Sequence, residues 1–242
     1  MKLFQRIFFA ALLAGLLAGA AMAALHQWKV APLILQAEVY ENAAPAHEHA
    51  TEAEATAPHE HEAEDWAPQD GAERIGYTVL ADILAAIGFA FVLAAVSIAA
   101  DIPLTARNGL IWGLAGYVAF QLWPAFGLPP ELPGMPAPEV LPRQIWWWGT
   151  ALAAGAGFIA IAKLRNWTAI GIAMILLLVP HIIGAPQLIG EHESGVPAHL
   201  ATEFAANALA TGAAFWLALG PLLGFFTERA ARGVPLVRRA AA

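Results

Sequence analysis

Long apolar segments recur along this chain of 242 residues, and they constrain its fold more than any other feature. A helix needs about 20 apolar residues to cross the hydrocarbon core of a bilayer. Segments of this kind occupy 4–25, 77–100, 106–123, 144–163, 167–186 and 201–226. Because lipid offers no hydrogen-bond partners, such segments form helices, which satisfy their own backbone groups. The sequence therefore predicts an all-α, polytopic integral membrane protein with about six transmembrane helices.

The scarcity of charge supports the same class of protein. Only 13% of the residues are charged and 59% are hydrophobic, whereas soluble domains carry about 25% charged residues. The chain has no cysteine, which excludes disulfides, thiolate metal ligands and cysteine nucleophiles. The formal net charge of −7 comes mainly from residues 38–73, so it describes one acidic segment. Nucleic-acid binding is not expected.

The span count stays open between about six and about five, because the first segment also has features of a signal peptide. It ends in Ala21-Met22-Ala23, a small-x-small pattern typical of signal-peptidase sites. However, it is longer than the usual signal core of about 7–15 residues. Gly15 and Gly19 also form a packing face that a discarded signal would not need. We therefore expect this helix to be retained; cleavage would leave the same outer loops.

Positive charges predict the orientation, since cytoplasmic loops are enriched in Lys and Arg. With the N-terminus inside, most of the 12 cations face the cytoplasm. They are Lys2, Arg6, Arg107, Lys163, Arg165, Arg229, Arg232, Arg238 and Arg239. We therefore expect a multi-pass protein of the bacterial inner membrane with both termini in the cytoplasm.

The predicted organisation follows from these spans and sides. A first transmembrane helix at 1–25 leads into an outer loop at 26–76, rich in histidine and acidic residues. A bundle of about five helices covers 77–226, and a basic cytoplasmic tail covers 227–242. Within the bundle, the outer loop 124–143 is rich in proline, which fixes backbone dihedrals and favours a stiff cover.

The first outer loop contains a near-duplicate His-Glu-His unit. The two copies are His47-Glu48-His49 and His59-Glu60-His61. We call residues 45–65, which hold both copies, the HEH loop. Its imidazoles and carboxylates suit divalent transition metals, and a loop too polar to fold alone could gather ligands without a preformed cage. The alternative is a solvated acidic tract in which histidine recurs by low-complexity repetition.

Two ionisable residues lie inside the predicted helices. Asp82 and His181 each lie roughly five residues from an outer helix end, which corresponds to a depth of roughly 8 Å. Such groups are costly in lipid and are functional candidates by default, so the two could share one metal site. Alternatively, Asp82 pairs locally while His181 satisfies a carbonyl that Pro180 frees.

Several longer motifs resemble the CbtA family of probable cobalt transporter subunits, over most of the chain. They are PLILQAE at 32–38, WAP at 66–68, GLIWGLAG at 109–116, LPPELPGMP at 128–136 and VPHIIGAP at 179–186. The resemblance implies uptake of Co²⁺ for cobalamin synthesis, together with a small one-span CbtB-type partner subunit. It implies about five spans and no organic cofactor. Ni²⁺ is an alternative cargo, because intrinsic affinity favours Ni²⁺ over Co²⁺.

Together these observations predict a subunit of a divalent-metal uptake transporter. The HEH loop would capture the ion, and Asp82 and His181 would pass it inward. The alternative is a membrane-anchored metal buffer or sensor that presents metal to a partner. An enzyme is disfavoured because the helices contain no H-E-x-x-H or similar pair. Export is disfavoured because the inner face lacks histidine. The sequence does not indicate the oligomeric state.

Overall fold

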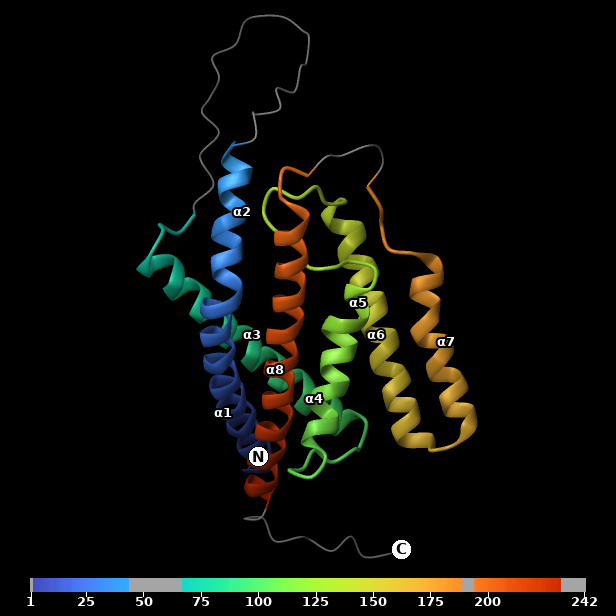
Figure 1. The fold of residues 1–242 in the computed structure, drawn as a ribbon. Helices are drawn as coiled ribbons and strands as arrows, with labels where there is room; N and C mark the ends of the chain where they lie inside the picture. Colours follow the sequence, from blue (N-terminus) through green and yellow to red (C-terminus); the bar gives the residue numbers. More distant parts are fainter. Residues whose placement is uncertain (1, 44–66, 189–193, 232–242) are drawn as a thin grey trace, which may run out of the picture.

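A computed structural model of the chain describes residues 2–43, 67–188 and 194–231, and its regular secondary structure in these ranges is entirely helical. The helices form one elongated bundle, and their connections gather at its two ends (Figure 1). In chain order the elements are α1 (Lys2–Leu25), the π-helix η1 (His26–Val30), α2 (Ala31–Ala43), α3 (Ala72–Ala99), α4 (Gly109–Tyr117), the π-helix η2 (Val118–Leu122), α5 (Trp123–Ala125), α6 (Val140–Leu164), α7 (Trp167–Ile183) and α8 (Ala198–Ala231).

Four helices in the described residues are long and apolar enough to cross a membrane. They are Phe4–Glu41, Ala72–Ala99, Val140–Leu164 and Ala198–Ala230. The prediction of an all-α membrane protein is confirmed at this level. The other two predicted spans correspond to α7, which is shorter, and to the segment formed by α4, η2 and α5. A total of about six or five spans therefore stays a prediction.

The first helix is longer than the sequence indicated. We expected it to end at Leu25 and the outer loop 26–76 to follow, but the helix continues through η1 and α2 to Ala43. The polar residues of η1 suggested a helix end. They are followed by Leu33 and Ala37, which are buried in a small core with α8 and therefore favour continued helix. The HEH loop lies outside the described residues.

Glycines set the closest helix contacts. A Cβ atom on Gly113 of α4 would lie 2.2 Å from the backbone oxygen of Trp216 in α8, and one on Gly220 would lie 2.1 Å from the oxygen of Gly109. Gly15 in α1 meets the backbone of Ile87 in α3 in the same way, at 2.5 Å. Small residues let membrane helices approach this closely, and dispersion and weak polar contacts then hold them. The packing face predicted for α1 is therefore used against α3.

These contacts join α1, α3, α4 and α8 around a shared core in which Trp216, Leu219 and Leu223 are buried. Ala14 and Ala18 of α1 belong to that core, so the first helix is an integral part of the fold. The α6–α7 hairpin packs beside η2 and α5 on the other side of the bundle (Figure 1).

The two ends of the bundle carry different segments. Arg6 donates a hydrogen bond to the backbone oxygen of Ala230 at 3.0 Å, so α1 begins where α8 finishes. The segment between α5 and α6, which holds the proline-rich loop, lies at the opposite end (Figure 1). Which end faces the cytoplasm stays a prediction from the positions of the cations.

We predict that Gly113→Ala destabilises the protein by about 1–3 kcal/mol, the usual cost of overpacking. The new methyl would meet a backbone oxygen, which cannot move without shifting α8. Thermal unfolding of the purified protein in detergent measures the change. The matched control is Gly88→Ala in α3, where no atom lies within 4 Å of the added carbon. Equal destabilisation by both variants would contradict this account of the α4–α8 contact.

Candidate functional site

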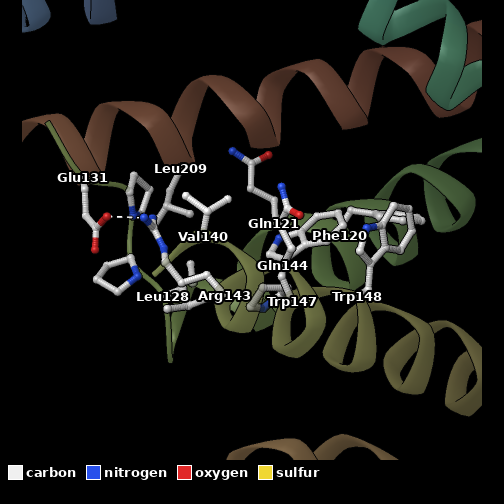
Figure 2. A pocket seen from close by; sticks show the side chains of 14 residues that line it. Phe120, Gln121, Leu128, Glu131, Val140, Arg143, Gln144, Trp147, Trp148 and Leu209 are labelled. Atoms are coloured by element: carbon white, nitrogen blue, oxygen red, sulfur yellow. Dashed lines mark hydrogen bonds and ion pairs between the residues drawn. The ribbon is translucent and has the colours of Figure 1, made fainter. Parts of the chain in front are cut away.

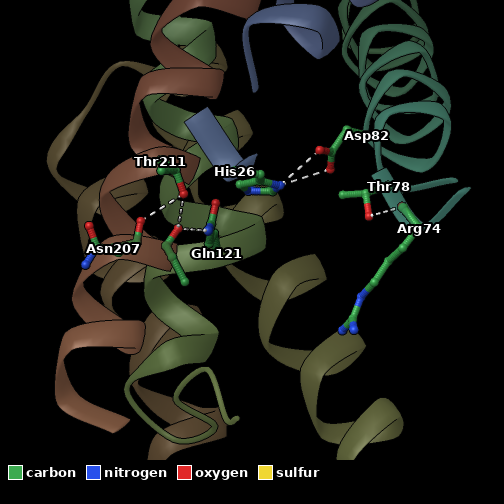
Figure 3. Close-up of polar contacts among 8 residues, drawn as sticks. His26, Arg74, Thr78, Asp82, Gln121, Asn207 and Thr211 are labelled. Atoms are coloured by element: carbon green, nitrogen blue, oxygen red, sulfur yellow. Dashed lines mark hydrogen bonds and ion pairs between the residues drawn. The ribbon is translucent and has the colours of Figure 1, made fainter. Parts of the chain in front are cut away.

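The most buried ion pair that the structure records joins η1 to α3. The Nδ1 atom of His26 lies 3.0 Å from Oδ1 and 3.1 Å from Oδ2 of Asp82 (Figure 3). The two side chains are only 21% and 12% exposed. An ionised carboxylate can only accept, so Nδ1 donates and the lone pair of a neutral imidazole lies on Nε2. Histidines that bind metals are oriented by a carboxylate on the other ring nitrogen in the same way.

The π-helical geometry of η1 coincides with this pair. A π turn inserts an additional residue per turn and changes the direction in which the following side chains point, and such turns are frequent at functional sites. The second π-helix, η2, carries Gln121. Both η1 and η2 contact α8. Each of the two π-helices in the described residues therefore carries a polar side chain and contacts the same helix, α8.

Further polar groups lie along α8 beside these turns. Gln121 donates through Nε2 to the oxygen of Ala208 at 3.0 Å, and its amide occupies the space above Gly212. Thr211 donates to the oxygen of Asn207 at 2.8 Å (Figure 3). We call His26, Asp82, Gln121, Asn207 and Thr211 the polar belt. Their side-chain oxygens and imidazole are groups that divalent cations accept as ligands.

A cavity of about 420 Å³ lies beside the pair and is lined by His26. It lies between η1–α2 and the start of α3, and its walls include His26, Gln27, Arg74 and Thr78. Its lining mixes apolar and polar side chains, and His26, with a side chain 21% exposed, borders it.

The structure does not bring His181 to Asp82. α3 and α7 lie on opposite sides of the bundle (Figure 1). The ring of His181 instead lies between those of Trp123 and Trp146, at centroid distances of 5.2 and 5.5 Å. The expectation of a shared site is therefore corrected. The sequence placed both residues at the same depth in the membrane. Depth alone does not determine on which side of the bundle each residue lies.

The alternative expectation, that His181 satisfies a carbonyl freed by Pro180, also differs from the structure. Its buried Nε2 has no hydrogen-bond partner among the described residues. The α7 carbonyls near Pro180 are satisfied by indoles instead, because Trp146 donates to the oxygen of Pro180 at 3.0 Å and Trp123 donates to that of Leu177 at 2.9 Å. Trp146, near the start of α6, therefore supports α7 through this hydrogen bond.

The HEH residues lie outside the described part of the chain. They are His47, Glu48, His49, His59, Glu60 and His61. Among the residues that the structure does describe, no three histidine or acidic side chains gather as a metal site would require. The polar belt thus offers one imidazole, one carboxylate and several neutral side chains, a set that suits brief contact with a cation more than permanent binding.

A second cavity, of about 520 Å³, lies under the proline-rich segment (Figure 2). Gln121, Gln144 and Trp147 line it, together with an ion pair in which Arg143 Nη2 lies 2.7 Å from Glu131 Oε2. The pair ties the proline-rich segment to α6, and the neighbouring Leu132 is buried in the small core with α2 and α8. The predicted stiff cover is thus packed onto the bundle.

We predict that His26 and Asp82 are energetically coupled. His26→Ala should cost about 1–3 kcal/mol of stability, because it leaves a largely buried carboxylate without its partner. Asp82→Asn should cost less, since the amide oxygen still accepts from Nδ1. Thermal unfolding of the single and double variants in detergent measures the coupling. Additive losses, within about 0.5 kcal/mol, would show that the pair contributes nothing.

Comparison with known proteins identifies one family. A family model described as "Probable cobalt transporter subunit (CbtA)" matches residues 4–228, nearly the whole chain. No curated protein and no solved structure matches.

Proposed function

The chain belongs to the CbtA family of probable cobalt transporter subunits, and from this premise we propose that it takes up Co²⁺ along a route that passes His26 and Asp82. One observation carries the residue assignment. The cavity between η1–α2 and the start of α3 is lined by His26, the partner of the largely buried Asp82. Ionisable groups at this depth are expensive, and the pair is positioned as a metal-binding imidazole would be.

The HEH loop is the proposed capture device. It lies in the segment between the end of α2 at Ala43 and the start of α3 at Ala72. These two helices contribute residues to the cavity walls. Because the loop is covalently attached at both sides of the cavity, an ion bound to its histidines stays at a high effective concentration near His26. The loop would raise the occupancy of the route when external metal is scarce.

Passage then requires ligands that bind weakly enough to release the ion. His26 Nε2 supplies one nitrogen, Asp82 orients it and adds negative charge, and water completes the coordination shell. The amide oxygen of Gln121 and the hydroxyl of Thr211 are candidates for the next contacts along α8. A divalent ion that moves inward also gains roughly 4.6 kcal/mol per 100 mV of membrane potential, twice the single-charge value. We assign His181 no part in this route.

The setting of the transporter is proposed from the sequence. Both termini would face the cytoplasm of a bacterial inner membrane, which follows from the cationic inner segments. The family description as a subunit implies a partner, for which we propose the small one-span CbtB-type protein. Co²⁺ is the proposed cargo and Ni²⁺ the alternative.

A metal buffer or sensor is the second candidate function. It is favoured by the lack of a three-ligand site in the described residues, because strong binding would then reside in the HEH loop alone. Deletion of residues 45–65 separates the two functions. A buffer would lose all metal-dependent behaviour, whereas a transporter would retain uptake at high external Co²⁺ with a weaker apparent affinity.

We predict that Asp82→Asn lowers uptake of radioactive Co²⁺ by about 10–100-fold in cells that express the chain with its partner. This is the range over which loss of the carboxylate behind a metal-binding histidine weakens binding. The matched control is Asp101→Asn, which changes a carboxylate at the opposite end of α3; its positive φ of 50° is one that asparagine tolerates. Undiminished uptake by Asp82→Asn at equal expression would exclude the pair from the route.

We also predict that uptake from limiting Co²⁺ falls as the external pH drops below about 6.5. Protons compete with metal for imidazole near its ordinary pKa, so protonation of the HEH histidines weakens capture. Uptake rates between pH 5 and 8 measure this dependence. The chain without residues 45–65 should show a smaller decline over the same interval, and an identical decline would place the titrating groups elsewhere.

A further inference from the structure

A bidentate ion pair lies beside the cavity that His26 lines. The guanidinium of Arg74 in α3 grips the carboxylate of Glu38 in α2 with both terminal nitrogens, Nη1 lying 2.9 Å from Oε2 and Nη2 bonding to Oε1. Nη1 also lies 3.1 Å from Oδ1 of Asp70. The side chains of Arg74 and Glu38 are 32% and 27% exposed. Glu38 is the last residue of the PLILQAE motif, and the pair takes no part in the functions assigned above.

The spacing of these residues places the α3 members of both pairs on one side of that helix. Arg74, Thr78 and Asp82 follow one another at intervals of four residues, so they share one side of α3 (Figure 3). Eight residues correspond to about 12 Å along a helix. Arg74, Thr78 and His26 all line the cavity. One member of each ion pair, Arg74 and His26, therefore lines the same cavity.

We propose that the Glu38 carboxylate is the first metal-binding group of the route. The guanidinium of Arg74 occupies this carboxylate when no metal is present, and the incoming divalent ion displaces it. This inference rests on the proposed function and adds a selection step to it. With no metal present, Arg74 neutralises Glu38 and joins α2 to α3 beside the cavity. When a divalent ion arrives from the HEH loop, it takes the Glu38 carboxylate, Arg74 swings aside, and the ion moves on to His26.

The proposal gives the route a reason to prefer divalent ions. A monovalent ion brings the same charge as the guanidinium but lacks its two parallel hydrogen bonds, so it cannot displace Arg74 from Glu38. A divalent ion brings twice the charge to the same carboxylate, and Coulomb attraction scales with charge. The exposed Asp70 remains nearby as a second acceptor for the released guanidinium.

Replacing Arg74 and replacing Glu38 should change Co²⁺ binding in opposite directions. A salt bridge with a purely structural role would not give this result. Equilibrium binding of radioactive Co²⁺ is measured on the purified full chain in detergent, with His47, His49, His59 and His61 replaced by Gln so that the loop does not mask the cavity. Arg74→Gln should tighten binding about tenfold because its competition for Glu38 is lost, which corresponds to ~1.4 kcal/mol. Glu38→Gln should weaken binding by a similar factor, and the double variant should resemble Glu38→Gln.

Two further variants keep the test decisive if either of these folds poorly. Arg74→Lys retains the positive charge but cannot donate two parallel hydrogen bonds to Glu38. It should therefore tighten Co²⁺ binding by a smaller factor than Arg74→Gln. Arg143→Gln is the matched control, because it breaks a comparable arginine–glutamate pair in the other cavity and should leave Co²⁺ binding unchanged.

The outcomes also separate the failure of this inference from failure of the proposed function. If Arg74→Gln and Glu38→Gln both weaken Co²⁺ binding, or if neither changes it, Arg74 has a structural role and does not compete with the metal for Glu38. This result would contradict the inference even when Co²⁺ uptake by the wild type is intact. If the wild-type chain neither takes up nor binds Co²⁺, the transport proposal itself fails. Tightened binding by Arg74→Gln, together with unchanged binding by Arg143→Gln, supports the inference.

Discussion

Close packing through small residues is the constraint on which the rest of this structure depends. Lipid tails are as apolar as leucine, so helices in a bilayer gain little from hiding apolar surface and rely on contact distance. Gly113 and Gly220 bring α4 against α8, and Gly15 brings α1 against α3. Because α1 continues into η1 and α2, the glycine contact with α3 also fixes the distance across which His26 meets Asp82 and Glu38 meets Arg74.

The elements that could be predicted are those with a strong one-dimensional signal. Apolar length gave the long helices, and small-residue spacing indicated the packing face at Gly15 and Gly19. The cost of a charge in lipid singled out Asp82. The partner of Asp82 was missed because His26 follows an apolar run and precedes Lys29, a pattern typical of a helix end. The helix instead continues, because Leu33 and Ala37 bury their side chains against α8.

The placement of side chains around the bundle could not be predicted from one sequence. Asp82 and His181 have similar depths, yet their helices lie on opposite sides, because the order of helices around a bundle is set by contacts between distant segments. The role of Trp146 in α7 was missed for a related reason. Tryptophan near a membrane surface is usually an interfacial anchor, and only the tertiary arrangement shows the indole bonding to the Pro180 carbonyl.

The length of the first helix has a consequence for where metal is captured. The segment Phe4–Glu41 has 38 residues, and at 1.5 Å per residue it spans about 57 Å, or about 54 Å at an average tilt of ~20°. A bilayer with its headgroups is about 40–45 Å thick. The helix is therefore about 10 Å longer than the bilayer is thick, and in the proposed orientation this excess would extend outside the membrane. A ligand carried at its tip would meet dissolved cations before the anionic phosphates of the lipids could sequester them.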